Sequence, residues 1–205
     1  AMEKLGDLSK HGKFVFWANG VDGQQLPPSA YEELTQRYKS NGEFIVLTVS
    51  RLMGWKRLDR AIGLADELAK MAPELNFKFL IVGEGSERAN LEALAKSSSA
   101  ASKIEFTGGV NHADVKKYLN MADAFVSMYD LSNVGNPLLE AIRANKIVFT
   151  LNNGDTSKWI QHRENGFIYT PEGNYLQEAA SELLELINNS ELQQSLRANV
   201  KNTEA

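Results

Sequence analysis

The sequence of 205 residues contains no cysteine, which excludes disulfide bonds and thiolate metal sites. It also lacks an apolar run long enough to span a bilayer and the pattern of a signal peptide, so we expect a cytoplasmic protein. Positive charge is not in excess, because the formal net charge is −4. That balance argues against a nucleic-acid partner held by a general basic face, although it allows a local basic pocket for phosphate.

Patterns that bind metals are missing as well. The three histidines, His11, His112 and His162, are scattered without the spacing of metal ligands. No Asp-x-Asp pair is present to hold a divalent ion. We therefore interpret the histidines as surface residues and expect neither a metal nor another cofactor.

The apolar residues suffice for one ordinary domain, since 43% of the chain is hydrophobic and a domain of this size buries about 70% of its unfolded surface. Short apolar runs alternate with amphipathic segments, which predicts an α/β fold with a doubly wound, Rossmann-like parallel sheet. Strands are expected at Phe44–Val49, Phe77–Val82, Ile104–Phe106, Ala124–Met128, Ile147–Thr150 and Phe167–Tyr169. Helices are expected at Leu58–Met71, Ser86–Lys96, Ala113–Asn120, Pro137–Ala144, Thr156–His162, Tyr175–Ile187 and Glu191–Val200.

The segment SNVGNPLLEAIRAN, which begins at Ser132, has the pattern of a loop and a helix N-terminus after a buried strand. We expect Gly135 to let the backbone turn tightly and Pro137 to lie in the first helical turn. Free backbone N–H groups and the helix dipole favour anions at such a place. One turn further, the Glu140 carboxylate can reach past a bound phosphate to sugar hydroxyls. The pattern also fits an ordinary junction in which Glu140 is a solvated acid.

Basic residues follow the first predicted strand in SRLMGWKRLDRAI, where Arg51 and Lys56 stand five positions apart across a loop containing Gly54. A guanidinium and an ammonium on such a loop can hold a diphosphate through charge-assisted hydrogen bonds. A lone basic pair is also common as ordinary surface charge.

Glycine clusters end the next two predicted strands. Gly83 and Gly85, in IVGEGSER, have the Gly-x-Gly spacing that also begins a dinucleotide fingerprint. The third glycine of a dinucleotide fingerprint is missing and Arg88 stands in its place, so a nicotinamide site is not indicated. Gly109 and Val110, in IEFTGGV, are compatible with a simple turn.

In this order, the motifs resemble those of retaining GT-B glycosyltransferases of the "glycosyl transferases group 1" family, which is glycosyltransferase family 4-like. The resemblance runs from Asn19-Gly20-Val21-Asp22 to about Thr170 and includes Glu164-Asn165-Gly166-Phe167. It implies the C-terminal, donor-binding half of a GT-B fold. The implied reaction transfers a hexosyl-type sugar, with retention, from a nucleoside diphosphate sugar to an acceptor, in polysaccharide or glycolipid synthesis.

The resemblance also implies roles for individual residues. Arg51 and Lys56 match the basic pair that stabilises the departing diphosphate. Glu140 matches the second glutamate of the Glu-x7-Glu signature, which holds the ribose. Further donor-binding positions, most of them through backbone groups, are Gly83, Gly85, Gly109, Val110, Gly135, Asn136, Leu138 and Leu139. No metal is implied.

The first glutamate of that signature is missing, because Ser132 stands at its position. A loop about two residues longer can bulge outward at small entropic cost and leave Asp130 at the end of the strand. We therefore predict that Asp130, rather than Ser132, contacts the donor sugar and completes the catalytic set with Arg51 and Lys56. The alternative is that Asp130 caps the loop by accepting from nearby backbone N–H groups.

The resemblance divides the chain into residues 1–40, an interdomain linker with a remnant of the preceding domain, and residues 41–205, the donor-binding domain. The acceptor domain is then absent, so we expect the isolated chain to bind donor but barely to turn over. The apolar segment Phe14–Ala18 should be loosely held or paired between chains.

The partners implied are a nucleoside diphosphate sugar and the acceptor domain, which allows peripheral association with the inner face of a membrane. Two alternatives stay open. One is another enzyme of the same architecture, a nucleotide-sugar epimerase or a phosphorylase, and the other is a non-catalytic nucleotide-sugar-binding module.

Overall fold

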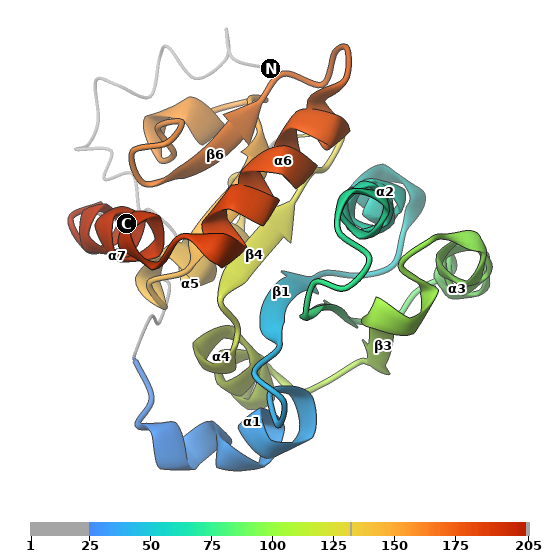
Figure 1. The fold of residues 1–205 in the computed structure, drawn as a ribbon, viewed down its shortest axis with the longest axis horizontal. Helices are drawn as coiled ribbons and strands as arrows, with labels where there is room; N and C mark the ends of the chain where they lie inside the picture. Colours follow the sequence, from blue (N-terminus) through green and yellow to red (C-terminus); the bar gives the residue numbers. More distant parts are fainter. Residues whose placement is uncertain (1–24, 132, 204–205) are drawn as a thin grey trace, which may run out of the picture.

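The computed structural model describes residues 25–131 and 133–203 of the chain. Six parallel strands form one sheet in the order β3-β2-β1-β4-β5-β6 (Figure 1). The strands are β1 Phe44–Val49, β2 Phe77–Val82, β3 Ile104–Gly108, β4 Ala124–Ser127, β5 Ile147–Leu151 and β6 Gly166–Tyr169. All the predicted strands are found, with ends shifted by at most two residues, and the doubly wound parallel sheet is confirmed. The segment Phe14–Ala18, the Asn19–Asp22 motif and His11 lie outside the described residues.

Helices connect the strands. The α-helices are α1 Glu32–Tyr38, α2 Leu58–Met71, α3 Arg88–Ser97, α4 His112–Met121, α5 Asn136–Arg143, α6 Tyr175–Asn188 and α7 Ser190–Lys201. Short 3-10 helices are η3 Pro28–Tyr31, η4 Gly54–Lys56, η5 Ala101–Lys103 and η6 Thr156–Lys158. Residues 28–38, which the sequence suggests are linker, form η3 and α1 and pack on α4, with Tyr38 fully buried.

The helix predicted at Thr156–His162 is wrong, since only the short turn η6 forms there. Side chains compete for the backbone of this segment. Asn165 accepts from the Gln161 N–H at 2.7 Å and donates to the Trp159 carbonyl at 2.8 Å. These bonds replace the helical ones that a second turn would need.

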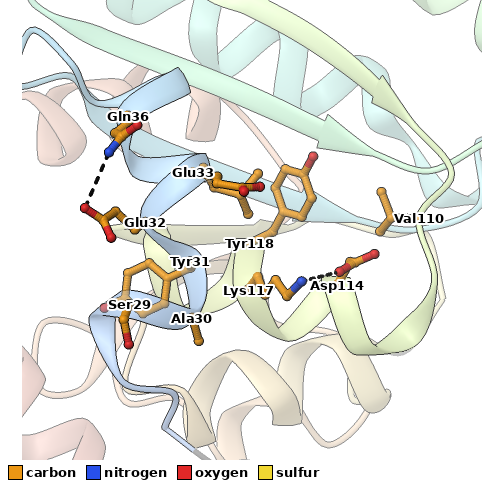
Figure 2. A pocket seen from close by; sticks show the side chains of 11 residues that line it. Ser29, Ala30, Tyr31, Glu32, Glu33, Gln36, Val110, Asp114, Lys117 and Tyr118 are labelled. Carbon is orange, nitrogen blue, oxygen red and sulfur yellow. Dashed lines mark hydrogen bonds and ion pairs between the residues drawn. The ribbon is translucent and has the colours of Figure 1, made fainter.

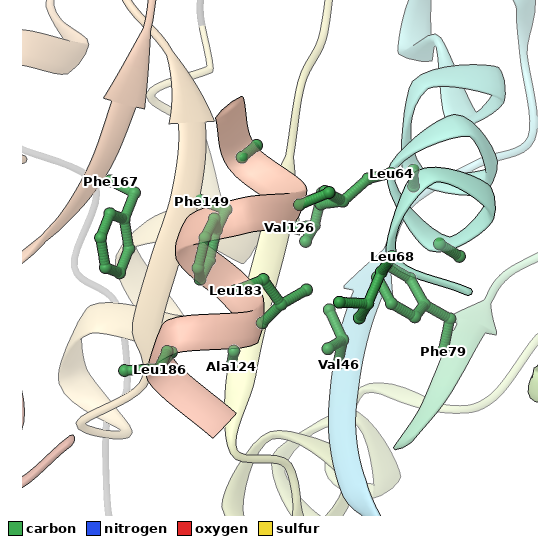
Figure 3. Packing of buried hydrophobic residues seen from close by; sticks show 14 of the residues in the cluster. Val46, Leu64, Leu68, Phe79, Ala124, Val126, Phe149, Phe167, Leu183 and Leu186 are labelled. Carbon is green, nitrogen blue, oxygen red and sulfur yellow. The ribbon is translucent and has the colours of Figure 1, made fainter. Parts of the chain in front are cut away.

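Successive residues of a strand point to opposite faces of the sheet, so both faces carry apolar side chains. Helices cover each of these faces. Val46 packs under α2 and α6 on one face, whereas Ile45 and Leu47 pack toward α1, α4 and α5 on the other. Figure 1 shows α6 in front of β4 and α5 behind it. In Figure 3, α6 lies beside Phe149 of β5, whose ring stacks on that of Phe167 of β6 with centroids 4.5 Å apart.

The strand order reverses direction between β1 and β4, which lie side by side. After β1 the chain winds outward to β2 and β3, and it then returns to place β4 on the other side of β1. The loops after β1 and β4 therefore leave the sheet at neighbouring points of its carboxyl edge, where open α/β sheets bind ligands. Among the described residues, no helix combines the length and apolar character needed to cross a membrane.

Candidate functional site

The loops after β1 and β4 contact each other at the switch point. The Asp130 N–H donates to the Trp55 carbonyl at 3.2 Å. The Tyr129 hydroxyl donates to the Val49 carbonyl at 3.4 Å, and the rings of Trp55 and Tyr129 meet edge to face with centroids 6.3 Å apart. The two loops thus form one surface, on which the predicted catalytic residues lie.

Both predicted basic residues stand on the loop after β1. Arg51 is exposed and Lys56 is half-buried at the end of η4. Burial, and next the positive charge of Arg51, lower the pKa of the Lys56 ammonium. Because the charge of Arg51 lowers the pKa of Lys56, the two positive charges repel each other across this loop. An anion placed between them would relieve their repulsion.

Asp130 lies at the end of β4 and is half-exposed. Its carboxylate accepts from Arg57 Nη1 at 3.1 Å and from Arg60 Nη2 at 2.6 Å. Arg60 also donates through Nη1 to the Met128 carbonyl at 2.9 Å, which fixes its guanidinium beneath the loop. Ser132, the position of the missing glutamate, lies outside the described residues.

Asn133 and Asn153, which the sequence analysis did not single out, fasten the loop after β4. Asn133 is fully buried, and its Oδ1 accepts from Ser127 Oγ at 3.0 Å and from the Tyr129 N–H at 2.8 Å. Asn153, after β5, donates to the Tyr129 carbonyl at 2.7 Å and accepts from the Asn133 N–H at 3.2 Å. One signal in the sequence could have indicated this contact. Asn133 and Asn153 lie in the loops that follow β4 and β5, which are adjacent strands.

Gly135 precedes α5, but the expected tight turn is wrong. Its φ and ψ of −144° and 173° are extended values that any residue adopts. A Cβ there would meet only the Pro137 Cδ atom, at 3.9 Å, so its surroundings would accept a side chain. The N–H groups of Leu138 and Leu139 both donate to the Gly135 carbonyl at 3.1 Å.

Glu140 stands one turn into α5, as predicted, yet it is only 7% exposed, so the alternative of a solvated acid is wrong. Its Oε1 lies 3.9 Å from His112 Nε2. His112 is the first residue of α4 and is well exposed, which confirms its surface position. Its place directly after the Gly109-Val110 motif is what brings it to this site.

Gly83 and Gly85 hold the loop after β2 against the loop that carries Arg51. A Cβ on Gly83 would overlap the Ser50 carbonyl oxygen, and a Cβ on Gly85 would overlap the Leu52 carbonyl oxygen. Gly83 also has a φ of +147°, which favours glycine. The two loops therefore approach each other closely through their backbones, and the approach of Gly83 and Gly85 to a bound donor stays a prediction.

Gly109 and Val110 follow β3. A Cβ on Gly109 would lie 3.2 Å from Glu84 Cγ, so this turn packs on the loop after β2. Val110 lines a hollow of about 560 Å³ between η3–α1 and α4 (Figure 2). Of the predicted site residues, it is the only one that lines this hollow. Figure 2 shows the Asp114–Lys117 ion pair of α4 on the floor of the hollow.

In the part of the chain that the structure describes, no group of three His, Asp or Glu side chains is arranged so that it could hold a metal ion. His162 instead packs edge to face on Phe167 and Tyr169 and lies 3.3 Å from a Glu182 carboxylate oxygen. It belongs to the packing of β6 on α6.

The sequence matches the family described as glycosyl transferases group 1 over residues 31–203. Among curated proteins, the alpha-monoglucosyldiacylglycerol synthase of Acholeplasma laidlawii is 24% identical over 205 residues, covering 97% of this chain and 50% of the synthase. The chain thus spans about half the length of that relative.

Solved structures of similar fold include the C-terminal domain of a glycosyl transferase group 1 family protein (LpcC) of Francisella tularensis. That domain has a TM-score of 0.72 at 22% identity, with 89% of this chain and 95% of that one covered. HepE of Anabaena, in complex with UDP-glucose, has a TM-score of 0.73 at 22% identity, with 86% of this chain and 48% of HepE covered. At these identities the likeness shows the fold.

Proposed function

Because the chain belongs to the glycosyl transferases group 1 family, we propose that it forms the donor-binding half of a retaining glycosyltransferase. The fold is that of the Rossmann-like domain of GT-B enzymes. The observation that carries the proposal is the pair Arg51 and Lys56 on the loop after β1, which contacts the loop after β4 at the switch point of the sheet. HepE, of the same fold, was solved with UDP-glucose. The ligand class we assign here is a nucleoside diphosphate sugar.

In this proposal the site acts mainly by electrostatics. Negative charge grows on the diphosphate as its bond to the sugar breaks, and fixed cations stabilise that charge. Arg51 and Lys56 supply the positive charge, and the N-terminus of α5 adds its dipole. The residues that we assign need no metal for this step.

Glu140 is assigned to the ribose. An ionised carboxylate accepts hydrogen bonds from two neighbouring hydroxyls at once. A buried carboxylate that lacks these partners costs more free energy than an exposed one, because water cannot replace them. Asp130 is assigned to the donor sugar, because it stands on the loop that contacts Trp55 and is held by Arg57 and Arg60. The acceptor and any contact with a membrane are assigned to the remaining half of the enzyme, since this chain spans half of its relative.

Calorimetric titration with UDP, GDP and UMP tests the ligand class. We expect a diphosphate to bind better than the monophosphate. The substitutions Arg51→Met and Lys56→Met should each weaken diphosphate binding by about 1.5–3 kcal/mol, the scale of a lost charge-assisted hydrogen bond. Lys96→Met, which removes an exposed lysine at the end of α3, is the matched control and should change nothing. Equal affinity for the diphosphate and the monophosphate of the base that the chain binds would overturn the proposal.

The same titration tests the ribose contact. The analogue 2′,3′-dideoxy-UDP lacks both ribose hydroxyls, so we expect the wild-type chain to prefer UDP to it. In Glu140→Gln that preference should shrink while the melting temperature stays close to that of the wild type. An unchanged preference together with a sharp fall in melting temperature would show that Glu140 is structural.

Product analysis on the full-length protein separates the transferase from its alternatives. A glycoside product supports the proposal. A free epimerised nucleotide sugar would indicate an epimerase, a sugar phosphate would indicate a phosphorylase, and donor binding without turnover would indicate a binding module.

A further inference from the structure

The ammonium of Lys56 lies between two aromatic rings. Its Nζ is 3.8 Å from the ring centroid of Tyr129 and 4.2 Å from that of Trp55. The two rings are nearly perpendicular, with an interplanar angle of 77°, and so enclose the ammonium from two directions. An ammonium within about 6 Å of an aromatic ring face is attracted by the ring quadrupole.

Carboxylates do not hold this lysine. Within the described residues, Lys56 forms no ion pair with an acidic side chain, whereas the nearby Arg57 and Arg60 both pair with Asp130. The acidic charge of the region is therefore used by the two arginines. The positive charge of Lys56 is left for an incoming anion.

Hydrogen bonds fix the Tyr129 ring and the backbone of Trp55. Tyr129 is buried, its hydroxyl donates to the Val49 carbonyl at 3.4 Å, and its N–H donates to Asn133 at 2.8 Å. Trp55 is tied to the loop after β4 by the bond from the Asp130 N–H to its carbonyl. The Tyr129 ring thus takes its position from the ends of β1 and β4, and the Trp55 ring contacts it edge to face.

We propose that Trp55 and Tyr129 are positioning residues that hold the Lys56 ammonium in place for the diphosphate of the donor. This inference rests on the proposed function of the site. A free lysine side chain loses rotamer freedom when it binds, which opposes binding. The aromatic rings impose much of that order in advance, and they do so without neutralising the charge that the phosphate needs.

Two measurements on the chain test this inference. The first is the chemical shift of the Lys56 ε-methylene group in the ligand-free protein, assigned through its loss in Lys56→Met. Ring currents should move this resonance upfield in the wild type, and Tyr129→Leu or Trp55→Leu should return it toward the usual lysine position. A usual position in the wild type would overturn the inference, whatever the protein binds.

The second measurement is UDP affinity. Tyr129→Leu and Trp55→Leu should weaken UDP binding by about five- to tenfold, while Tyr129→Phe and Trp55→Phe keep a ring and should stay within about twofold of the wild type. Trp55 is partly exposed, so its variants remain informative if Tyr129→Leu fails to fold.

Phe77→Leu is the matched control, because it removes a ring that faces Lys103 Nζ at 4.9 Å, at the start of β2 and away from the loops after β1 and β4. It should leave UDP affinity unchanged. Leucine variants that bind UDP like the wild type would overturn the inference and leave the proposed function intact. A wild-type chain that binds neither UDP nor GDP would overturn the proposed function itself.

Discussion

Asp130 illustrates how the setting of one residue bears on its role. The carboxylate is half-exposed and contacts two guanidinium groups, so its exposed part can face a ligand while its position stays fixed. Arg57 has a second partner in Asp59, at 2.8 Å, and Arg60 keeps the Met128 carbonyl. Loss of the Asp130 charge therefore leaves neither arginine without a partner.

We predict that Asp130→Asn lowers sugar transfer by about a hundredfold or more on the full-length protein, with nucleotide affinity close to normal. The amide keeps the size of the side chain but removes the negative charge assigned to the sugar. Steady-state kinetics with a saturating donor measure the effect, and Ser132→Ala is the control that should change little. If Ser132→Ala is the damaging change, a hydroxyl rather than the Asp130 carboxylate holds the donor sugar.

At the scale of elements, the loops after β1 and β2 depend on each other. The Leu52 N–H donates to the Glu84 carbonyl at 2.9 Å, and the Glu87 N–H donates to the Leu52 carbonyl at 3.0 Å. Such a pair of bonds needs the two backbones in direct contact, which only glycine permits at positions 83 and 85.

We predict that Gly83→Ala and Gly85→Ala each destabilise the fold by about 1–3 kcal/mol, because the added methyl group overlaps rigid backbone atoms. Urea unfolding measures the change. Gly54→Ala, in the same region, is the control, since a Cβ there meets no atom within 4 Å. That control should be nearly neutral. Alanine variants as stable as Gly54→Ala would show that the two loops separate easily.

The strands were predictable because β1 and β2 are short apolar runs, interrupted only by Thr48 and Lys78, of the kind found in buried parallel strands. The position of Arg51 and Lys56 on one loop after β1 was predictable because both follow that strand within a few residues in the sequence, whereas their role as a diphosphate site stays a prediction. Contacts between loops that are distant in the sequence were not predictable. The ring of Tyr129, for example, contacts Lys56 only because β4 lies beside β1 in the sheet. The false helix at Thr156–His162 has the same origin, because Asn165 reaches back to it after folding.

At the scale of the whole molecule, the two edges of the sheet differ. The carboxyl edge carries the candidate site. The amino edge carries a charged cluster in which Lys39 donates to Asp123 at 2.7 Å, and Asp123 accepts from the N–H of Ile45 at 2.8 Å. Lys146, only 6% exposed, donates to the carbonyls of Asn120 and Ala122 at the end of α4. Groups of this edge should affect stability without affecting the ligand.

The pH dependence of stability should reveal the effect of Lys146 on the fold separately from ligand binding. Burial, with the nearby charges of Arg197 and Lys39, lowers the pKa of its ammonium to about 7, against the opposing effect of Asp123. An unfolded lysine titrates near 10.4, so between about pH 7 and 10 the unfolded chain binds more protons than the folded one. The free energy of unfolding should therefore rise with pH across this window and be lowest below pH 7.

We predict a contribution from Lys146 with a slope approaching about 1.4 kcal/mol per pH unit, the value for one proton. Urea unfolding at pH 7.5, 8.5 and 9.5 should show this rise in the wild type, and Lys146→Met should lack it. Subtracting the two curves removes every other titrating group. Calorimetry at pH 7.5 should give the same UDP affinity for both proteins, because Lys146 lies at the edge opposite the site. Parallel stability curves would show that the carbonyls of Asn120 and Ala122 keep the buried ammonium charged throughout.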